Sequence, residues 1–162
     1  MTINELTFRY DVAVTDVKAV EDLVRNTGFF SEDEIRIAAE LVSERLDKGT
    51  GSGYYFIFAE NRNRMIGYSC YGPIPATSFS YDLYWIAVDQ HWQGKGIGRL
   101  LLAESEKMIA ANGGQRIYVE TAGRPQYRST REFYLRCGYE QVACLEHFYA
   151  PDDAKIMYLK CV

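Results

Sequence analysis

The stretch Val88-Asp89-Gln90-His91-Trp92-Gln93-Gly94-Lys95-Gly96-Ile97-Gly98-Arg99 decides the fold of this chain. It follows a strand-like run over 79–88 and opens a helical pattern over 96–112. Glycines in such a turn let backbone N–H groups approach a ligand closely, and a helix N-terminus favours an anion. Lys95 and Arg99 add positive charge. The stretch therefore predicts a site for a ligand that carries phosphate.

Two common nucleotide motifs do not fit these glycines. A P-loop needs the pattern G-x-x-x-x-G-K-[ST], which is absent. A Rossmann fingerprint needs G-x-G-x-x-G, and counting from Gly94 and Gly96 its last position falls on Arg99. A glycine-rich helix start without any ligand is the alternative that the residues themselves leave open.

A third pattern does fit, because Gln93-x-x-Gly96-x-Gly98 matches the Q/R-x-x-G-x-G/A signature of the GNAT acetyltransferases, which bind the pyrophosphate of acetyl-coenzyme A (acetyl-CoA). The run Leu83-Tyr84-Trp85-Ile86-Ala87-Val88 also resembles the fourth strand of that family. Glu132-Phe133-Tyr134-Leu135-Arg136-Cys137-Gly138-Tyr139 resembles its FYxxxGF/Y motif. The resemblance covers essentially the whole chain and is strongest over 80–140.

The order of elements agrees with this resemblance. Period-two and period-3.6 patterns predict a first strand, two helices, three strands, a helix, a strand, a helix and two strands. The expected strands are 6–10, 54–60, 64–71, 79–88, 115–121, 139–148 and 154–161. The expected helices begin near Val17, Ser31, Gly96 and Ser129. The α/β chain, 1–162, is thus expected to form one GNAT domain. The resemblance implies a mixed, mostly antiparallel sheet of about seven strands, in which 79–88 and 115–121 are parallel and splayed, with about four helices.

Composition excludes several other classes of protein. The 162 residues carry a net charge of −4, which argues against a nucleic-acid partner. The longest apolar runs are far shorter than the ~20 residues that span a bilayer, so no membrane partner is expected. The N-terminal residues resemble no secretory signal, which predicts a cytoplasmic protein.

The cysteine and histidine patterns predict no metal. His91 and His147 are isolated from other ligand types, and the cysteines have no zinc spacing. In a cytoplasmic protein the cysteines are expected to be reduced core residues. They are Cys70, Cys137, Cys144 and Cys161.

The resemblance implies how the cosubstrate acetyl-CoA is held. Backbone groups of Ile86, Ala87 and Val88 would bind the pantetheine arm, with the Val88 amide as the donor to the oxyanion. The pyrophosphate would lie on the loop and helix start that comprise Gln93, Gly94, Lys95, Gly96, Ile97, Gly98 and Arg99. One position departs from the family, because Tyr127 stands where many relatives carry an Asn that contacts the cofactor. Arg128 or Arg131 could contact phosphate there, although solvation at a helix start is the alternative.

Acetyl transfer to an amine needs proton transfers. A free amine has a pKa of about 10 and a thiol one of about 8.5, so a base and an acid both help. The resemblance implies that Tyr134 protonates the leaving sulfur and that Glu120 deprotonates the amine. A carboxyl at the end of an apolar strand is a candidate for a raised pKa. Asp82 and Tyr84 are rival bases, and the alternatives are a packed aromatic ring and a solvated carboxylate.

The acceptor is expected to be a small cationic amine or a peptide N-terminus. The acidic net charge, Glu120, and the turn residues Asp152 and Asp153 favour a cation. The acceptor should contact Phe29-Phe30 and the segments 121–128 and 148–153, which vary in the family. A longer acyl donor, a homodimer, and a catalytically idle acyl-CoA sensor or regulatory module are left open by the sequence.

Overall fold

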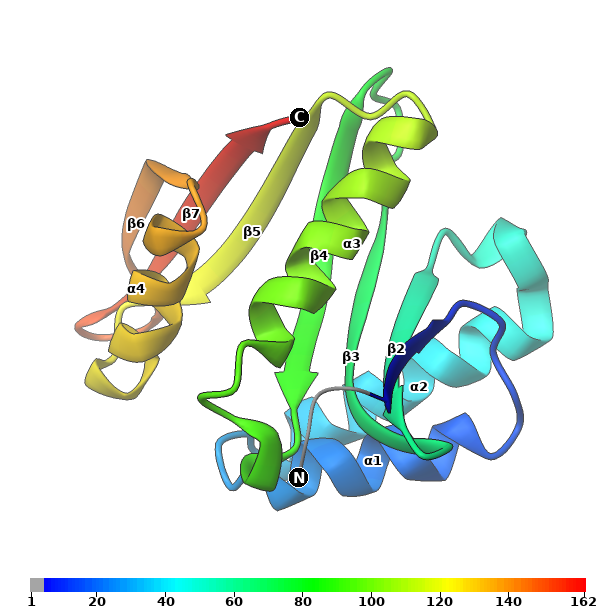
Figure 1. Ribbon diagram of the computed structural model, residues 1–162. Helices are drawn as coiled ribbons and strands as arrows, with labels where there is room; N and C mark the ends of the chain where they lie inside the picture. The colour runs from blue at the N-terminus through cyan, green and yellow to red at the C-terminus, as the bar shows by residue number, and fades with distance from the viewer. Residues whose placement is uncertain (1–4) are drawn as a thin grey trace. The chain divides into compact units, whose positions relative to one another are not determined.

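The computed structural model describes residues 5–162, and within them one seven-stranded mixed sheet carries the fold (Figure 1). The strand order is β1-β2-β3-β4-β5-β7-β6. The strands are β1 Leu6–Arg9, β2 Tyr55–Asn61, β3 Arg64–Pro73, β4 Ser80–Val88, β5 Arg116–Ala122, β6 Glu140–Ala150 and β7 Asp153–Cys161. The α-helices are α1 Asp16–Asn26, α2 Glu32–Lys48, α3 Ile97–Ala111 and α4 Arg128–Arg136. The α/β class and the order of elements are confirmed.

The parallel pair β4–β5 is short. Its register runs from Ser80↔Arg116 to Asp82↔Tyr118 and ends there, although both strands continue. On its other edge β5 pairs with β7 over its whole length, from Arg116↔Cys161 to Ala122↔Lys155. The expected parallel and splayed arrangement is therefore present. The insertion of β7 between β5 and β6 is a finding that the order of elements did not predict.

A first compact unit comprises residues 5–72 and 85–107 of the described chain. Alternate residues of β2 face opposite sides, so Phe56 and Phe58 join the core that α1 and α2 cover. In Figure 1, α1 and α2 lie on one side of β2 and β3, and α3 lies on the other. A capping box starts α2, because Ser31 Oγ accepts the Glu34 N–H at 3.2 Å and Glu34 Oε2 accepts the Ser31 N–H at 2.7 Å.

Close approach of α3 requires a glycine on β3. A Cβ at Gly67 would lie 3.0 Å from both the Ala87 carbonyl oxygen and Leu101 Cδ1. Ser69 lies two residues after Gly67 on β3. Its buried hydroxyl forms a hydrogen bond of 2.7 Å with the buried hydroxyl of Ser105 on α3, across the same interface. These contacts fix the start of α3, and hence the glycine loop that precedes it.

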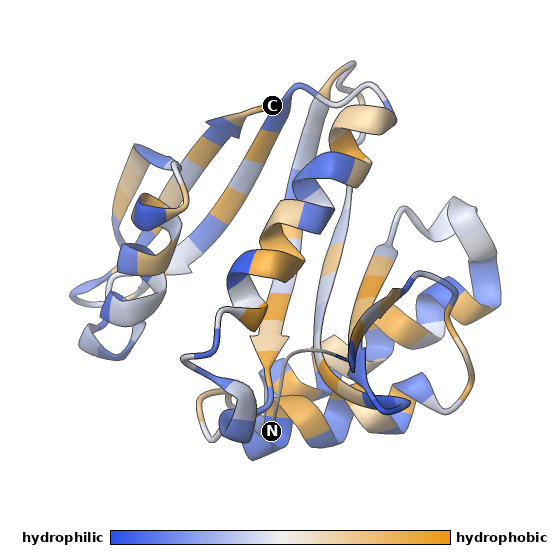
Figure 2. Cartoon of the chain, in the orientation of Figure 1, coloured by the Kyte–Doolittle hydropathy of each residue, from blue (hydrophilic) through white to orange (hydrophobic). Residues whose placement is uncertain are grey.

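The second compact unit comprises residues 73–84 and 108–162. Figure 2 shows hydrophobic and hydrophilic residues alternating along β5, as expected for a strand whose two faces differ. One face packs under α4, where Tyr134 contacts the rings of Tyr139 and Tyr158 with centroids 5.5 and 6.3 Å away. Within the described residues of this unit, α4 leaves the opposite face of β5 and β7 without a helix.

Gly114→Ala is expected to destabilise the second unit. A Cβ at Gly114 would lie 2.3 Å from Ile109 Cγ2 and 2.8 Å from the Tyr81 ring. Overpacking of this kind costs about 1–3 kcal/mol of unfolding free energy, measurable by urea denaturation. Gly51→Ala is the matched control, because nothing lies within 4 Å of a Cβ there. Equal midpoints for the two variants would contradict the prediction.

The cysteine prediction is only partly right. No disulfide joins the four cysteines in the described residues, but only Cys70 is fully buried, and Cys144 and Cys161 are exposed. Both lie on the strands β6 and β7, whose outer positions reach solvent. No helix among residues 5–162 is long and apolar enough to cross a bilayer.

Candidate active site

The loop that leads into α3 is built on an Asp–His turn and a tryptophan anchor. Asp89 follows β4, and its Oδ1 accepts the His91 N–H at 2.8 Å, which starts the short 3₁₀ turn Gln90–Trp92. Trp92 is buried, and Lys95 Nζ lies 4.9 Å from the centre of its ring. The sequence interpretation had no such turn, although an Asp that accepts an N–H two residues on is a common turn signal.

Two glycines of the loop adopt a backbone that L side chains rarely reach. Gly94 has φ of 74° and Gly96 has φ of 83°, and a Cβ at either would meet nothing within 4 Å. The first intrahelical bond of α3 runs from the Leu100 N–H to the Gly96 carbonyl. The N–H groups of residues 97–99 therefore precede the hydrogen-bonded turns of the helix and are available to an anion. The exposed side chains of Lys95 and Arg99 flank this position.

The end of β4 presents backbone groups away from β3. The Asp89 N–H is donated to the Ile66 carbonyl of β3 at 2.8 Å. Successive N–H groups of a strand point to opposite edges, so those of Val88 and Ile86 point away from β3. The Gln93 side chain donates to the Val88 carbonyl at 3.0 Å and ties the loop to this edge. An extended ligand with amide groups could therefore bond to this part of β4.

Tyr134 lies inside the second unit. Its side chain is 3% exposed among Phe133, Tyr139 and Tyr158, and burial raises the pKa of its phenol well above the ordinary value. The hydroxyl therefore stays protonated at neutral pH and is able to donate a proton. The packed ring that was the alternative for this residue is therefore present, and its role as the acid stays a prediction.

Glu120 of β5 and Asp82 of β4 lie close together, on the face of these strands that points away from α4. Glu120 is exposed and its Oε1 lies 2.8 Å from Lys155 Nζ. Burial raises the pKa of Asp82, the charge of Glu120 raises it further, and Lys155 lowers it. The partly buried carboxyl is therefore Asp82, whereas Glu120, the predicted base, is exposed. Tyr84, two residues along β4, is exposed.

The two expected catalytic residues are on opposite faces of the same strands. Val119 is opposite Tyr158, which packs against Tyr134, whereas Glu120 is opposite Met157 on the other face. The alternation of side chains along a strand makes this arrangement unavoidable. The side chains of Tyr134 and Glu120 are therefore on opposite sides of β5 and β7.

The charges of the neighbouring loops are mostly neutralised by the chain itself. Asp153 is buried and its Oδ2 pairs with Arg124 Nε at 3.1 Å, so the expected negative turn is reduced to the exposed Asp152. Arg131 donates to the carbonyls of Ala122 and Arg124, and Arg128 pairs with Glu132. These interactions of Arg131 and Arg128 stabilise the loop after β5.

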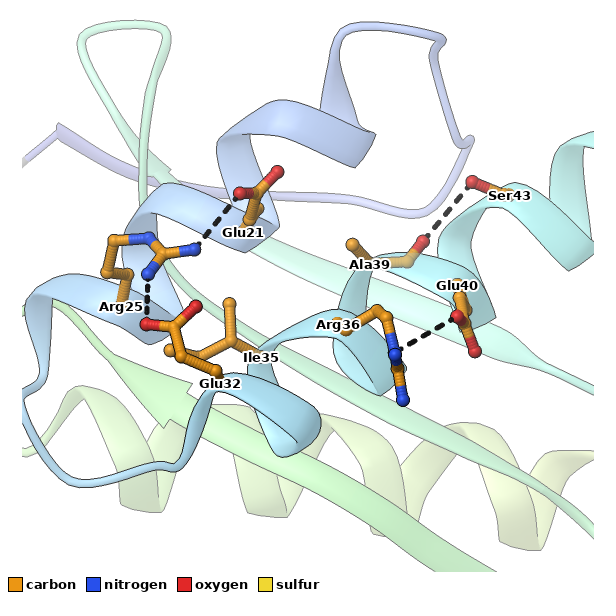
Figure 3. A pocket seen from close by; sticks show the side chains of 8 residues that line it. All are labelled: Glu21, Arg25, Glu32, Ile35, Arg36, Ala39, Glu40 and Ser43. Carbon is orange, nitrogen blue, oxygen red and sulfur yellow. Dashed lines mark hydrogen bonds and ion pairs between the residues drawn. The ribbon is translucent and has the colours of Figure 1, made fainter.

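A hollow of about 240 Å³ lies between α1 and α2 (Figure 3). Its charged side chains are paired with one another, Arg25 with Glu21 and Glu32, and Arg36 with Glu40. It contains none of the expected site residues. Among the described residues, no group of His, Cys, Asp and Glu could hold a metal ion.

Comparison with known proteins identifies the family. The sequence matches the GNAT acetyltransferase domain model over residues 52–141, more than half of the chain. A structure of a protein assigned to the GNAT family, from Desulfovibrio desulfuricans, is 45% identical, with a TM-score of 0.95. The match covers 96% of this chain and 98% of that one. The chain therefore belongs to the GNAT acetyltransferase family.

More distant relatives have named activities. N-alpha-acetyltransferase RimI of Mycobacterium tuberculosis is 29% identical over 101 residues, which are 62% of this chain and 61% of that protein. The chain spans 26% of a second curated relative, an uncharacterized protein of Mycobacterium leprae. An aminoglycoside 6'-N-acetyltransferase solved with coenzyme A has the same fold, with 20% identity, a TM-score of 0.76 and 96% of both chains covered.

Proposed function

We propose that this protein transfers an acetyl group from acetyl-CoA to a primary amine, by direct attack in a ternary complex. The observation that carries the proposal is the end of β4. There, the Ile86 and Val88 amides point away from β3, and a glycine loop and a helix N-terminus follow. This order suits a cofactor with an amide-containing arm and a pyrophosphate.

The cofactor contacts follow from this backbone. Ile86, Ala87 and Val88 bind the pantetheine arm, and the Val88 N–H stabilises the oxyanion of the tetrahedral intermediate. The segment Gln93–Arg99 holds the pyrophosphate, with Lys95 and Arg99 as charge partners. Relatives of the same fold include a protein solved with coenzyme A, which supports this assignment.

The reaction forms a bond from the amine nitrogen to the acetyl carbonyl carbon and breaks the bond from that carbon to sulfur. The amine loses a proton, to Glu120 or to its neighbour Asp82, and the sulfur gains one from Tyr134. Because these groups lie on opposite faces of β5 and β7, proton removal and proton delivery are separated. Burial would raise the pKa of the leaving thiol as it raises the pKa of the phenol, and so would offset part of the loss of acidity of Tyr134.

One experiment separates catalysis from mere binding. Release of coenzyme A thiol is measured with acetyl-CoA and a panel of primary amines and peptides. Turnover with any of them supports the proposal. Tight acetyl-CoA binding without turnover would instead support an idle acyl-CoA-binding module, which the pairing of Glu120 with Lys155 favours.

Gly96→Glu is expected to raise the acetyl-CoA dissociation constant at least tenfold, about 1.4 kcal/mol. The side chain would enter the space where the backbone meets the pyrophosphate, and its charge would repel phosphate. Gly113→Glu is the matched control, since Gly113 has φ of 85° and equally open surroundings at the far end of α3. Calorimetry that finds the same affinity for both folded variants would contradict the cofactor site.

A further inference from the structure

The face of the second unit that α4 leaves uncovered carries an unequal set of charges. The register places Asp82 opposite Tyr118 on β4 and β5, and Glu120 opposite Met157 on β5 and β7. Lys155 lies two residues before Met157 on β7, and its side chain is on the same face because side chains alternate along a strand. We call the face formed by these five residues the open face: Asp82, Tyr118, Glu120, Lys155 and Met157. It holds two carboxylates and one ammonium.

Lys155 is fixed in this position. Its Nζ lies 2.8 Å from Glu120 Oε1 and 4.8 Å from the centre of the Phe148 ring, and its side chain is 16% exposed. The lysine therefore neutralises one of the two carboxylates with little freedom to move away. The half-buried Asp82 experiences both charges, the repulsion of Glu120 and the attraction of Lys155. One negative charge is left without an equal partner on the open face.

The surroundings of these charges are apolar. Met157 is opposite Glu120, and Leu145 of β6 is opposite Lys155. Leu145 and Phe148 are 45% and 53% exposed, which is high for such large apolar side chains. An acceptor on the open face would balance the remaining negative charge with one positive charge and would contact apolar side chains.

We propose that Lys155 determines acceptor specificity, by restricting the enzyme to amines with a single positive charge on an apolar body. The proposal rests on the acetyltransferase function proposed above. The acceptor ammonium approaches Asp82 and completes the charge balance of the open face. A second positive charge would lie near Lys155 without a carboxylate of its own, and such unpaired charges are strongly discriminated against.

The test compares two acceptors of equal length, hexylamine and hexamethylenediamine, which differ in whether the far end is a methyl or an ammonium group. Wild-type protein is expected to have a kcat/KM at least tenfold higher for hexylamine. Lys155→Met should lower this ratio at least tenfold by favouring the diamine, and Lys155→Arg should restore it. A purely structural role of Lys155 would lower both rates together and leave the ratio unchanged.

Lys160→Met is the matched control. Lys160 is also on β7, but its Nζ donates to the Cys137 carbonyl at 2.9 Å and lies over the Tyr139 ring, on the α4 side. Lys160→Met also removes one positive charge, and the ratio of kcat/KM for hexylamine to that for the diamine should stay as in wild type. A tetrapeptide with N-terminal leucine, compared with hexylamine, shows whether the single ammonium belongs to a peptide or to a small amine.

The outcomes separate this inference from the function that it rests on. Turnover of both amines with a wild-type preference for the diamine, or with the same ratio in Lys155→Met, would overturn the role of Lys155 and leave acetyl transfer intact. No thiol release with any amine would overturn the proposed function and the specificity with it.

Discussion

Replacement of Tyr134 by Phe is expected to lower kcat by about 10²–10⁴-fold, because the leaving sulfur loses its proton donor. The ring stays in its cluster with Tyr139 and Tyr158, so the fold should survive. The acetyl-CoA dissociation constant should change little, since the hydroxyl acts on the transition state. Single-turnover kinetics, in which chemistry limits the rate, provides the measurement.

The control for this variant is Tyr158→Phe. Tyr158 is 2% exposed and stacks on Tyr134, so its replacement removes a hydroxyl from the same cluster. It should keep a kcat close to that of wild type. Equal losses in the two variants would indicate that the cluster needs its hydroxyls for packing, and a wild-type kcat in Tyr134→Phe would exclude it as the acid.

Glu120→Gln and Asp82→Asn are expected to differ in rate and in pH dependence, and the variant that removes the base should lose about 10²-fold or more in kcat/KM. The base acts as a carboxylate, so kcat/KM rises with pH through its apparent pKa. Burial raises the pKa of Asp82, and the negative charge of Glu120 raises it further. If Asp82 is the base, Glu120→Gln therefore moves the rising limb to lower pH and retains it.

If Glu120 is the base, Glu120→Gln removes that limb together with the rate, and Asp82→Asn has the smaller effect. Titration of the acceptor amine also produces a rising limb, but that limb is common to wild type and both variants. The comparison therefore isolates the carboxylates. A rate and a pH profile unchanged in both variants would leave the base role to Tyr84 acting through water, or to no group of the protein.

Local signals made most of the elements predictable. The Ser31–Glu34 capping box at the start of α2 is a short-range pattern in the sequence. The segment Asn61-Arg62-Asn63 joins β2 to β3, and Arg62 and Asn63 have the positive φ of a tight hairpin turn. The glycines at 94 and 96 adopt the backbone that only glycine reaches easily. These features depend on residues within a few positions of one another.

Long-range pairing decided what the sequence could not. Lys155 meets Glu120 only because β7 enters the sheet beside β5, and Asp153 is buried because Arg124 reaches it from the loop after β5. Neither partner follows from spacing. The opposite faces of Tyr134 and Glu120 also depend on this register. The residue types of the candidate site were therefore predictable, whereas their charges and neighbours needed the structure.

The position of β7 also has a consequence for biosynthesis. Strands β5 and β6 are made before β7, but both pair with β7 rather than with each other. During translation, the edges of β5 and β6 that pair with β7 therefore stay unpaired until the segment 153–161 leaves the ribosome. Exposed edges of this kind attract other strands and chaperones. The second unit is thus expected to fold late, after the hairpin β2–β3 and its helices have already formed.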